Sequence, residues 1–365
     1  MRIGFLTPWS LDDPDSWSGI LTPMVAALRR EAEVVHVPVP DVPHHLLDRA
    51  ATRALGALRR GYLPGHGLAT SRATGPAVAE AVAAARVDVV LSVAASSTLA
   101  FADLDVPVVE VSDATFRLLV GYYPLFSSLS APARWQGEAL GRRTARRAAG
   151  FLLASDWAAA SLVDDYGVDP SRVRVSPFGP SVVATEPSRG PWPGEPLRVL
   201  FVGSDWTRKG GDVALEVVAR LRDRGVRNVL TVVGDAPGLP SGVRRVGRVR
   251  RSRMRELYAA HDVLLEPARA NAGGVTLTDA TASGLPVVAA RTGGVPSIVE
   301  DGVTGFLVDP DDLVAGSVDA LARLTDHERW RTMARASRDR GATVLSWATW
   351  AGAARELCDE VRVSR

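Results

Sequence analysis

The sequence predicts an α/β protein made of two doubly wound domains, each a parallel sheet covered by helices. Short runs of β-branched residues alternate with longer Ala-, Leu- and Arg-rich segments of helical period, which is typical of parallel strands joined by helical crossovers. The pattern occurs twice, on either side of the proline-rich stretch 177–196. The 365 residues, 46% of them hydrophobic, can fill two domains of roughly 150 to 200 residues each.

Six strands are expected in each half of the chain. In the first half they are RIGFLTP, AEVVHVPVP, VDVVLSV, VPVVEVS, GFLLAS and VRVSPFG. In the second half they are LRVLFVGS, VLTVVGD, VRRVG, DVLLEP, PVVAA and GFLVDP. We therefore expect a first domain over 1–180, a linker over 181–196, a second domain over 197–340, and a C-terminal helix over 341–365 that packs on the first domain. Two such domains facing each other leave a cleft at the carboxyl ends of both sheets, where ligands bind.

Charge and cysteine content exclude several classes of protein. The net charge is +2, from 43 basic and 41 acidic residues, so the chain lacks the basic excess that nucleic-acid phosphates require. The single cysteine, Cys358, excludes an internal disulfide framework and a cysteine-based zinc cluster. No window of about 18 apolar residues predicts a membrane-spanning helix, and the segment before Pro8 is too short for a signal peptide. We expect a cytoplasmic protein with no nucleic-acid partner.

A glycine-containing loop follows the expected strand DVLLEP. The stretch NAGGV is that loop, and TLTDATASG is a helix that Gly284 closes. Gly273 and Gly274 let main-chain N–H groups and the positive end of the helix approach an anion closely. A diphosphate would suit this pocket, whereas a Gly-Gly pair taken alone is more often just a tight turn.

The longer segment from Asp262 to Asp309 resembles the donor-binding core of the retaining glycosyltransferases of family four, also called glycosyl transferases group 1. That resemblance implies the two-domain GT-B fold. Members of the family have two glutamates separated by seven residues, of which the first lies near the donor sugar and the second binds the nucleotide ribose. Their positions fall on Asn271 and Asp279, so the spacing is kept while both residue types differ. Asp279 can still accept two hydrogen bonds from a ribose diol.

The resemblance extends upstream to FVGSDWTRKGGD. Family members have a Gly-Arg pair there and, five residues after the arginine, a lysine; both cations are directed at the donor diphosphate. In this chain Gly203 is followed by Ser204, and Lys209 stands at the position of the lysine with Arg208 beside it. We expect Arg208 to supply part of the lost positive charge, and the replacement of glutamate by Asn271 to offset the rest.

Composition points to Lys209 independently of the family. It is the only lysine in the chain, and the other 42 of the 43 basic residues are arginine. An ammonium group is a compact point charge that enters a crowded phosphate site where a planar guanidinium would not fit. A stray surface lysine in an arginine-biased sequence is the alternative.

The first domain contains fewer candidates. The resemblance places Gly19 in a loop close to the donor phosphates and Asp113 just after the fourth strand, facing the cleft. Asp113 is expected either to hydrogen-bond a sugar hydroxyl or to cap the following helix. Four aromatic residues are candidates for a sugar-stacking surface, with core packing as the alternative: Trp9, Trp17, Tyr122 and Tyr123.

The resemblance implies transfer of a glycosyl group from a nucleotide diphosphate sugar to an acceptor hydroxyl with retained anomeric configuration. Lys209 and the N–H groups of Gly273, Gly274 and Val275 would stabilise the leaving diphosphate. Its departing oxygen would take the acceptor's proton, so neither an enzyme nucleophile nor a metal ion nor another cofactor is expected. The base, expected to be that of UDP or GDP, would lie near the run that begins at Gly247.

The acceptor class stays open between a saccharide, a lipid-linked substrate and a small metabolite. The basic helix expected over 134–150 would suit weak peripheral membrane contact, with a solvated helix face as the alternative. Because Ser204, Asn271 and Asp279 depart from the family pattern, a catalytically silent protein that binds a nucleotide sugar is the alternative function. A dinucleotide-dependent oxidoreductase is disfavoured, since the loops after the first strand of each domain lack the spacing G-x-G-x-x-G.

Overall fold

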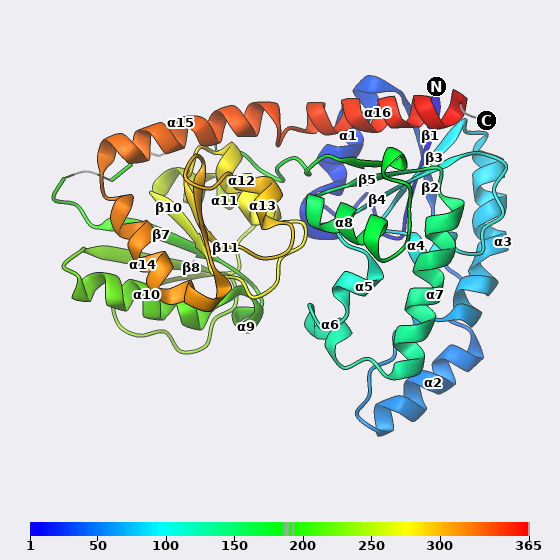
Figure 1. Cartoon of the computed structure of the whole chain (residues 1–365), viewed down its shortest axis with the longest axis horizontal. Helices are drawn as coiled ribbons and strands as arrows, with labels where there is room; N and C mark the ends of the chain where they lie inside the picture. Colours follow the sequence, from blue (N-terminus) through cyan, green and yellow to red (C-terminus); the bar gives the residue numbers. More distant parts are fainter. Residues whose placement is uncertain (185, 187–189, 192, 364–365) are drawn as a thin grey trace. The chain divides into compact units, whose positions relative to one another are not determined.

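The chain divides into two compact units, each with its own sheet (Figure 1). Unit 1 comprises Met1–Ser176 and Trp350–Arg365, and unit 2 comprises Pro177–Thr349. The computed structural model describes residues 1–184, 186, 190–191 and 193–363. Part of the expected linker, at 185, 187–189 and 192, therefore lies outside the described residues, and the described part of the linker groups with unit 2.

Unit 1 contains a six-stranded sheet in the order β2-β1-β3-β4-β5-β6, with every pair parallel. All six strands expected in the first half of the chain are confirmed. Central strands such as β3 are buried along their whole length, which explains their near-continuous apolar sequences. The strands are β1 (Arg2–Thr7), β2 (Glu33–Pro38), β3 (Val89–Val93), β4 (Val108–Ser112), β5 (Gly150–Leu153) and β6 (Val173–Val175).

Helices connect these strands, as right-handed crossovers between parallel strands require. They are α1 (Leu21–Glu31), α2 (Leu46–Ala57), α3 (Leu68–Ala85), α4 (Ser96–Leu99), α5 (Phe116–Leu119), α6 (Pro124–Ser127), α7 (Ala131–Arg147) and α8 (Asp156–Asp164), with short 3₁₀ turns at Ser16–Gly19, Pro64–His66 and Pro170–Arg172.

The last helix, α16 (Trp347–Val363), begins in unit 2 and continues from Trp350 in unit 1. It packs tightly on β5: a Cβ atom at Gly150 would lie 3.1 Å from Leu357 Cδ1 and 3.2 Å from Val361 Cγ1. The expected helix over 341–365 is therefore in fact the end of one helix, α15 (His327–Thr343), followed by α16.

Unit 2 contains a second parallel sheet of six strands, in the order β12-β11-β10-β7-β8-β9. The six strands expected in the second half of the chain are also confirmed. They are β7 (Leu197–Val202), β8 (Asn228–Val233), β9 (Arg244–Gly247), β10 (Val263–Glu266), β11 (Val287–Ala290) and β12 (Gly305–Val308). The helices are α9 (Trp206–Lys209), α10 (Gly211–Asp223), α11 (Arg251–Ala260), α12 (Val275–Ala282), α13 (Val295–Ile298), α14 (Leu313–Arg323) and α15, with a 3₁₀ turn at Pro310–Asp312.

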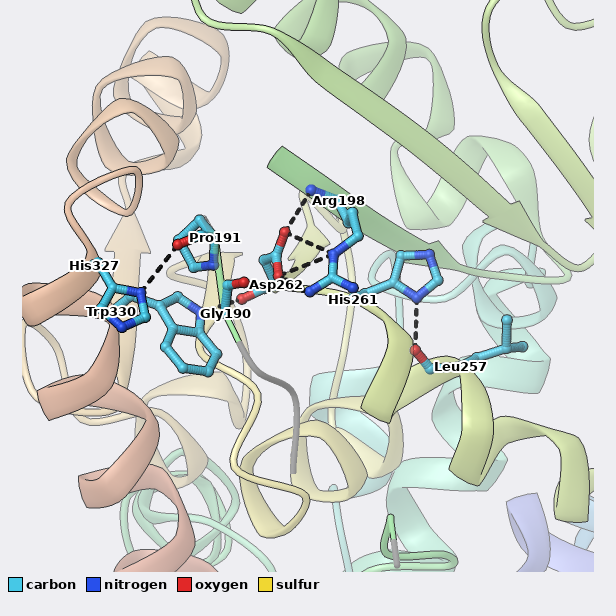
Figure 2. Close-up of polar contacts among 8 residues, drawn as sticks. All are labelled: Gly190, Pro191, Arg198, Leu257, His261, Asp262, His327 and Trp330. Atoms are coloured by element: carbon cyan, nitrogen blue, oxygen red, sulfur yellow. Dashed lines mark hydrogen bonds and ion pairs between the residues drawn. The ribbon is translucent and has the colours of Figure 1, made fainter. Parts of the chain in front are cut away.

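An ion pair between the half-buried Arg198 and the buried Asp262 joins the amino ends of β7 and β10 (Figure 2). The Asp262 carboxylate, whose side chain is 1% exposed, accepts hydrogen bonds from the Arg198 main-chain N–H at 2.7 Å and from Arg198 Nε at 3.1 Å. Trp330 of α15 donates from Nε1 to the Asp262 carbonyl oxygen at 2.6 Å. This network binds α15 to the amino ends of the strands, which lie opposite the carboxyl ends where ligands are expected.

Asp262→Asn is expected to lower the free energy of unfolding of unit 2 by about 2 kcal/mol, because a buried carboxylate that accepts charge-assisted hydrogen bonds is removed. Hydrogen exchange of the β7 and β10 amides measures the loss. Asp319→Asn, which breaks an exposed ion pair with Arg224, is the control and should cost only a few tenths of a kcal/mol. Equal effects of the two substitutions would contradict a structural role for the buried pair.

Candidate functional site

The first site lies in unit 2, where the strand order changes direction. From β7 the chain builds one side of the sheet through β8 and β9, then crosses to β10 and builds the other side. The loops that follow β7 and β10 therefore meet at a topological switch point, where doubly wound folds bind their ligands. Arg269 in the loop after β10 donates its main-chain N–H to the Arg208 carbonyl oxygen in the loop after β7, at 2.8 Å.

Lys209, Glu266 and Asn271 form a buried polar cluster at this point, and their exposed fractions are 9%, 2% and 5%. Lys209 Nζ lies 3.1 Å from Glu266 Oε1, and the same oxygen accepts a hydrogen bond from Asn271 Nδ2. Among the described residues, none hydrogen-bonds to the other buried oxygen, Glu266 Oε2. The predicted lysine is therefore a buried cation paired with a carboxylate, so its placement rules out the alternative of a stray surface lysine.

Two glycines make room for Lys209. A Cβ atom at Gly203, which follows β7, would lie 2.9 Å from both Cβ and Cγ of Lys209. Gly210 ends α9 in the left-handed region with φ +73°, and a side chain there would collide with the Pro267 carbonyl oxygen in the loop after β10. The sequence RKGG thus places the lysine side chain at the switch point. Glycine at position 203 leaves the space that the Lys209 side chain occupies.

Asn271 shapes the loop that leads into α12. Its Oδ1 accepts the Gly274 N–H at 3.0 Å, and its carbonyl oxygen accepts the Gly294 N–H at 3.1 Å. Gly274 has φ +58° and is the residue directly before α12, so Gly273 precedes the helix and Val275 is its first residue. The predicted Gly274 N–H contact with diphosphate would require this bond to Asn271 to be exchanged.

Asp279 of α12 is 4% exposed and holds the chain segment that enters unit 2. Its carboxylate accepts hydrogen bonds from Ser181 N at 2.6 Å, Ser181 Oγ at 2.7 Å and Val182 N at 3.2 Å. Burial raises the pKa of this carboxyl to about 6, although the bonds from Ser181 and Val182 lower it. These three bonds already occupy most of the hydrogen-bond acceptor capacity of the carboxylate. The predicted contact of Asp279 with the ribose therefore stays a prediction.

The remaining predicted residues of unit 2 have different positions. Arg208 donates to the Ala270 carbonyl oxygen at 3.0 Å and pairs with Asp205 at 3.3 Å, so in this structure it braces the two loops. Ser204 is exposed after β7, and Gly247 ends β9 with φ +75°. Although Asn271 stands where the family has a glutamate, the cluster still contains a carboxylate, which Glu266 supplies. Glu266 was not predicted from the sequence.

The second site is a cavity of about 530 Å³ inside unit 1, which we call the unit 1 cavity. The direction of the strand order reverses between β1 and β3, and residues that follow these strands line the cavity. Two of them, Trp17 and Ala94, are not glycine but have φ of +45° and +51°. Such strained backbone is enriched at functional sites, and two of the five non-glycine residues with positive φ among the described residues line this cavity.

Two acidic side chains line the unit 1 cavity. Glu110 of β4 is 7% exposed, and burial raises the pKa of its carboxyl to about 7. Asp113 follows β4, and burial raises the pKa of its carboxyl to about 6. The alternative that Asp113 caps the next helix is wrong, because Thr115 is the cap of α5 and accepts the Leu118 N–H.

The other predicted residues of the first domain divide into two groups. Trp9 and Trp17 line the unit 1 cavity, whereas Tyr122 and Tyr123 are not among its lining residues and form an edge-to-face pair with each other. Gly19 is buried with φ +72° and follows Trp17 in the loop after β1. Two of the four aromatic residues named from the sequence, Trp9 and Trp17, therefore line the cavity. Glu110, which also lines it, was not predicted.

The raised pKa of Glu110 predicts a pH dependence. The folded state keeps this carboxyl protonated at pH values above its ordinary pKa of 4.5. The stability that the group contributes is therefore fully present below pH 4.5 and is lost as the pH rises through its folded-state pKa of about 7. Glu110→Gln should flatten the pH dependence of hydrogen exchange in β3 and β4; the slope that Asp113 contributes in the same direction should persist. Glu80→Gln, at an exposed position of α3, is the control and should leave the slope unchanged.

Comparison with known proteins gives a family for part of the chain. Residues 196–327 match the family model described as Glycosyl transferases group 1. A D-inositol 3-phosphate glycosyltransferase of Thermobifida fusca is 32% identical over 225 residues, which are 54% of this chain and 52% of the relative. D-inositol 3-phosphate glycosyltransferase 2 of Catenulispora acidiphila is 35% identical over 214 residues, which are 49% of this chain and 50% of the relative. The chain spans about half the length of these curated relatives.

The whole chain resembles solved structures in fold. Anabaena Alr3699/HepE in complex with UDP-glucose has a TM-score of 0.67 with 18% identity, and the alignment covers all of both chains. Sucrose-phosphate synthase from Thermosynechococcus elongatus has the same TM-score, identity and coverage. These structures confirm the predicted GT-B fold, and the matches bear out the resemblance to glycosyl transferases group 1 over the part of the chain that they cover. Within the described residues, no helix is long and apolar enough to cross a membrane.

Proposed function

We propose, from the premise that residues 196–327 belong to the glycosyl transferases group 1 family, that this protein transfers a glycosyl group from a nucleotide diphosphate sugar to an acceptor hydroxyl. One observation carries the proposal: the only lysine of the chain is buried at the switch point of unit 2, and its partner Glu266 also bonds Asn271, which accepts the Gly274 N–H directly before α12. An ammonium group and a helix N-terminus at one point are suited to a diphosphate.

Lys209 would stabilise the charge that develops on the diphosphate as the glycosyl bond breaks. Stabilisation of this kind accelerates the reaction only where it is stronger in the transition state than with the bound substrate. Such a difference would arise because the negative charge on the phosphate oxygen that the ammonium group contacts grows as the glycosyl bond breaks. Gly273 and Val275 would add main-chain N–H groups at the start of α12.

The proposed reaction keeps the anomeric configuration of the sugar. The departing phosphate oxygen takes the proton of the acceptor hydroxyl on the face from which it leaves, so the reaction requires no covalent intermediate with the protein. Asp113, after β4, would hydrogen-bond a hydroxyl of the substrate. The proposal assigns the neutralisation of the diphosphate to Lys209 and main-chain N–H groups, without a metal ion.

The comparisons narrow the candidate substrates. The structure of Alr3699/HepE with UDP-glucose supports a uridine diphosphate sugar as the first donor to test, with guanosine diphosphate sugars as the second class. The names of the relatives make inositol 3-phosphate a first acceptor to test. Saccharides, lipid-linked substrates and small metabolites complete the acceptor classes that the proposal admits.

The test is release of nucleoside diphosphate from a panel of UDP-, GDP-, ADP- and TDP-sugars, with water alone and with mixed acceptor alcohols. Release with one nucleotide class, together with a product whose anomeric configuration by NMR equals that of the donor, supports the proposal. Inversion of the configuration would contradict the retaining mechanism. Tight nucleotide-sugar binding without release, with any acceptor, would favour the alternative of a silent binding protein.

A further inference from the structure

The unit 1 cavity has an unusual inventory of charge. Among its lining residues, all of which belong to the described part of the chain, there are two acidic side chains, Glu110 and Asp113, and no lysine or arginine. This is notable in a chain with 42 arginines. The one lining histidine, His66, is held neutral, because burial lowers its pKa to about 4. A phosphate or carboxylate ligand would therefore meet no side-chain cation in this cavity and would face two acidic groups.

The rest of the lining is largely apolar and preformed. The rings of His66 and Phe116 lie 5.2 Å apart, and those of Phe116 and Phe126 meet edge to face at 5.9 Å. Seven rings and several leucines line the wall: the rings are Trp9, Trp17, His66, Phe116, Phe126, Phe151 and Tyr166, and the leucines include Leu119 and Leu125. Such a wall favours a flat or apolar body, and aromatic faces also attract cations.

The two acidic groups come from one segment of the chain. Both belong to β4 or to the residue directly after it, and Ser96, which bonds to Glu110, lines the cavity as well. Burial without a basic partner disfavours the ionised form of these carboxyl groups unless a ligand cation compensates. A ligand ammonium group would compensate by forming charge-assisted hydrogen bonds with them.

We propose that the unit 1 cavity binds the acceptor as an amino alcohol, whose ammonium group pairs with Glu110 and Asp113 and whose apolar body lies against the aromatic wall. That the bound molecule is the acceptor of the reaction rests on the proposed function. The ammonium site itself rests on the cavity alone. The volume of about 530 Å³ lies within the range of pockets that hold drug-sized molecules. The proposal selects one of the open acceptor classes, the small metabolite, over the inositol 3-phosphate that the relatives' names suggest.

Three probe molecules that share one ring and differ only in their terminal group test the ammonium site. Tyramine, tyrosol and 4-hydroxyphenylacetate share a hydroxyphenyl ring on a short arm, and they end in an ammonium group, a hydroxyl group and a carboxylate. Binding to the full chain is measured by calorimetry and by ligand-observed NMR at mildly alkaline pH, where both carboxyl groups are ionised. Tyramine should bind at least about tenfold more tightly than tyrosol, and the carboxylate should bind most weakly.

Variants of nearly unchanged shape show which groups select the cation. Glu110→Gln and Asp113→Asn should each reduce the ratio of tyramine to tyrosol affinity, and the double variant should bring it close to one. Because the ratio compares two ligands of one sample, partial unfolding changes both affinities and leaves the ratio intact. Glu80→Gln removes an exposed carboxylate from unit 1 away from the cavity and should keep the wild-type ratio.

Three results would overturn the ammonium site: equal binding of tyramine and tyrosol, tightest binding of the carboxylate, or no binding of any probe at its solubility limit. Nucleoside diphosphate release from donor sugars is measured in parallel. Release without the cation preference leaves the proposed function standing and overturns this inference. A cation preference that depends on Glu110, in a protein that neither binds nor cleaves any nucleotide sugar, supports the ammonium site and overturns the proposed function.

Discussion

Lys209→Ala is expected to weaken binding of the nucleoside diphosphate of the donor by about 100-fold or more. The side chain is 9% exposed and is placed by Gly203 and Gly210 at the switch point of unit 2. Truncating one partner of a buried, hydrogen-bonded charge pair typically costs about 2 to 5 kcal/mol. Calorimetric titration of the wild type and the variant with UDP and GDP measures the loss, which should appear for the nucleotide that the wild type binds.

The alanine variant also leaves Glu266 buried without its cation, so loss of folding must be separated from loss of a ligand contact. The double variant Lys209→Met/Glu266→Gln removes both charges at similar volume, and it should fold and still lose the diphosphate. Arg222→Ala, which removes an exposed charge from α10 in the same unit, should bind as the wild type does. Unchanged affinity in the double variant would show that the diphosphate does not bind at Lys209.

Glu266→Gln is expected to change affinity in the opposite direction, with at least about tenfold tighter binding of the nucleoside diphosphate. Glutamine can still accept the hydrogen bonds of Lys209 and Asn271, but it no longer neutralises the ammonium group or repels the ligand. At an effective dielectric constant of about 20, two unit charges about 6 Å apart repel each other by roughly 3 kcal/mol. Titration at two salt concentrations measures the gain, which should be larger at the lower one.

Glu216→Gln makes the same change in net charge on the exposed face of α10 and is the matched control for Glu266→Gln. It should change the affinity far less. If Glu266→Gln instead weakened binding tenfold, the carboxylate would be needed to position Lys209, and its charge would not oppose the ligand. In that case turnover should fall together with affinity.

The fold was predictable because its signal is local. Most of the twelve strands have apolar, β-branched sequences, since parallel strands covered on both faces have no solvated side to be polar, whereas the edge strand β9, RRVG, carries two exposed arginines. The helix after NAGGV was predicted for the same reason, and Gly284 closes it with φ +71°. The break between α15 and α16 was missed, because the helical period continues on both sides of residues 344–346.

The candidate sites were predictable only in part. Lys209 and Asn271 were located because they follow strands at the switch point and match family positions. Glu266 and Glu110 were missed, although a signal was present: each is a charged residue that directly follows an apolar run, VLL or VPVV, within an expected strand. A charge in a strand buried on both faces requires a partner or a ligand, so the strand pattern by itself makes such residues candidates.

The contacts of Asp279 and Arg208 were not predictable from local pattern. Asp279 bonds to Ser181, 98 residues earlier in the chain, and Arg208 bonds to the Ala270 carbonyl oxygen, 62 residues later. Such long-range partners depend on how the chain returns to the sheet, which motif spacing does not encode. Family positions identified which residues are near the site, and the structure shows that these two also hold its loops together.

The central claim is that unit 2 binds a nucleotide diphosphate sugar at Lys209, and its most direct test is ligand-induced stabilisation. Unfolding of the full chain is followed with UDP-, GDP-, ADP- and TDP-sugars, for the wild type and for Lys209→Met/Glu266→Gln. A ligand at about 100 times its dissociation constant should add about 2.7 kcal/mol to the free energy of unfolding of unit 2. The account predicts this gain for one nucleotide class, in the wild type only. No gain with any nucleotide sugar, or an equal gain in the double variant, would contradict it.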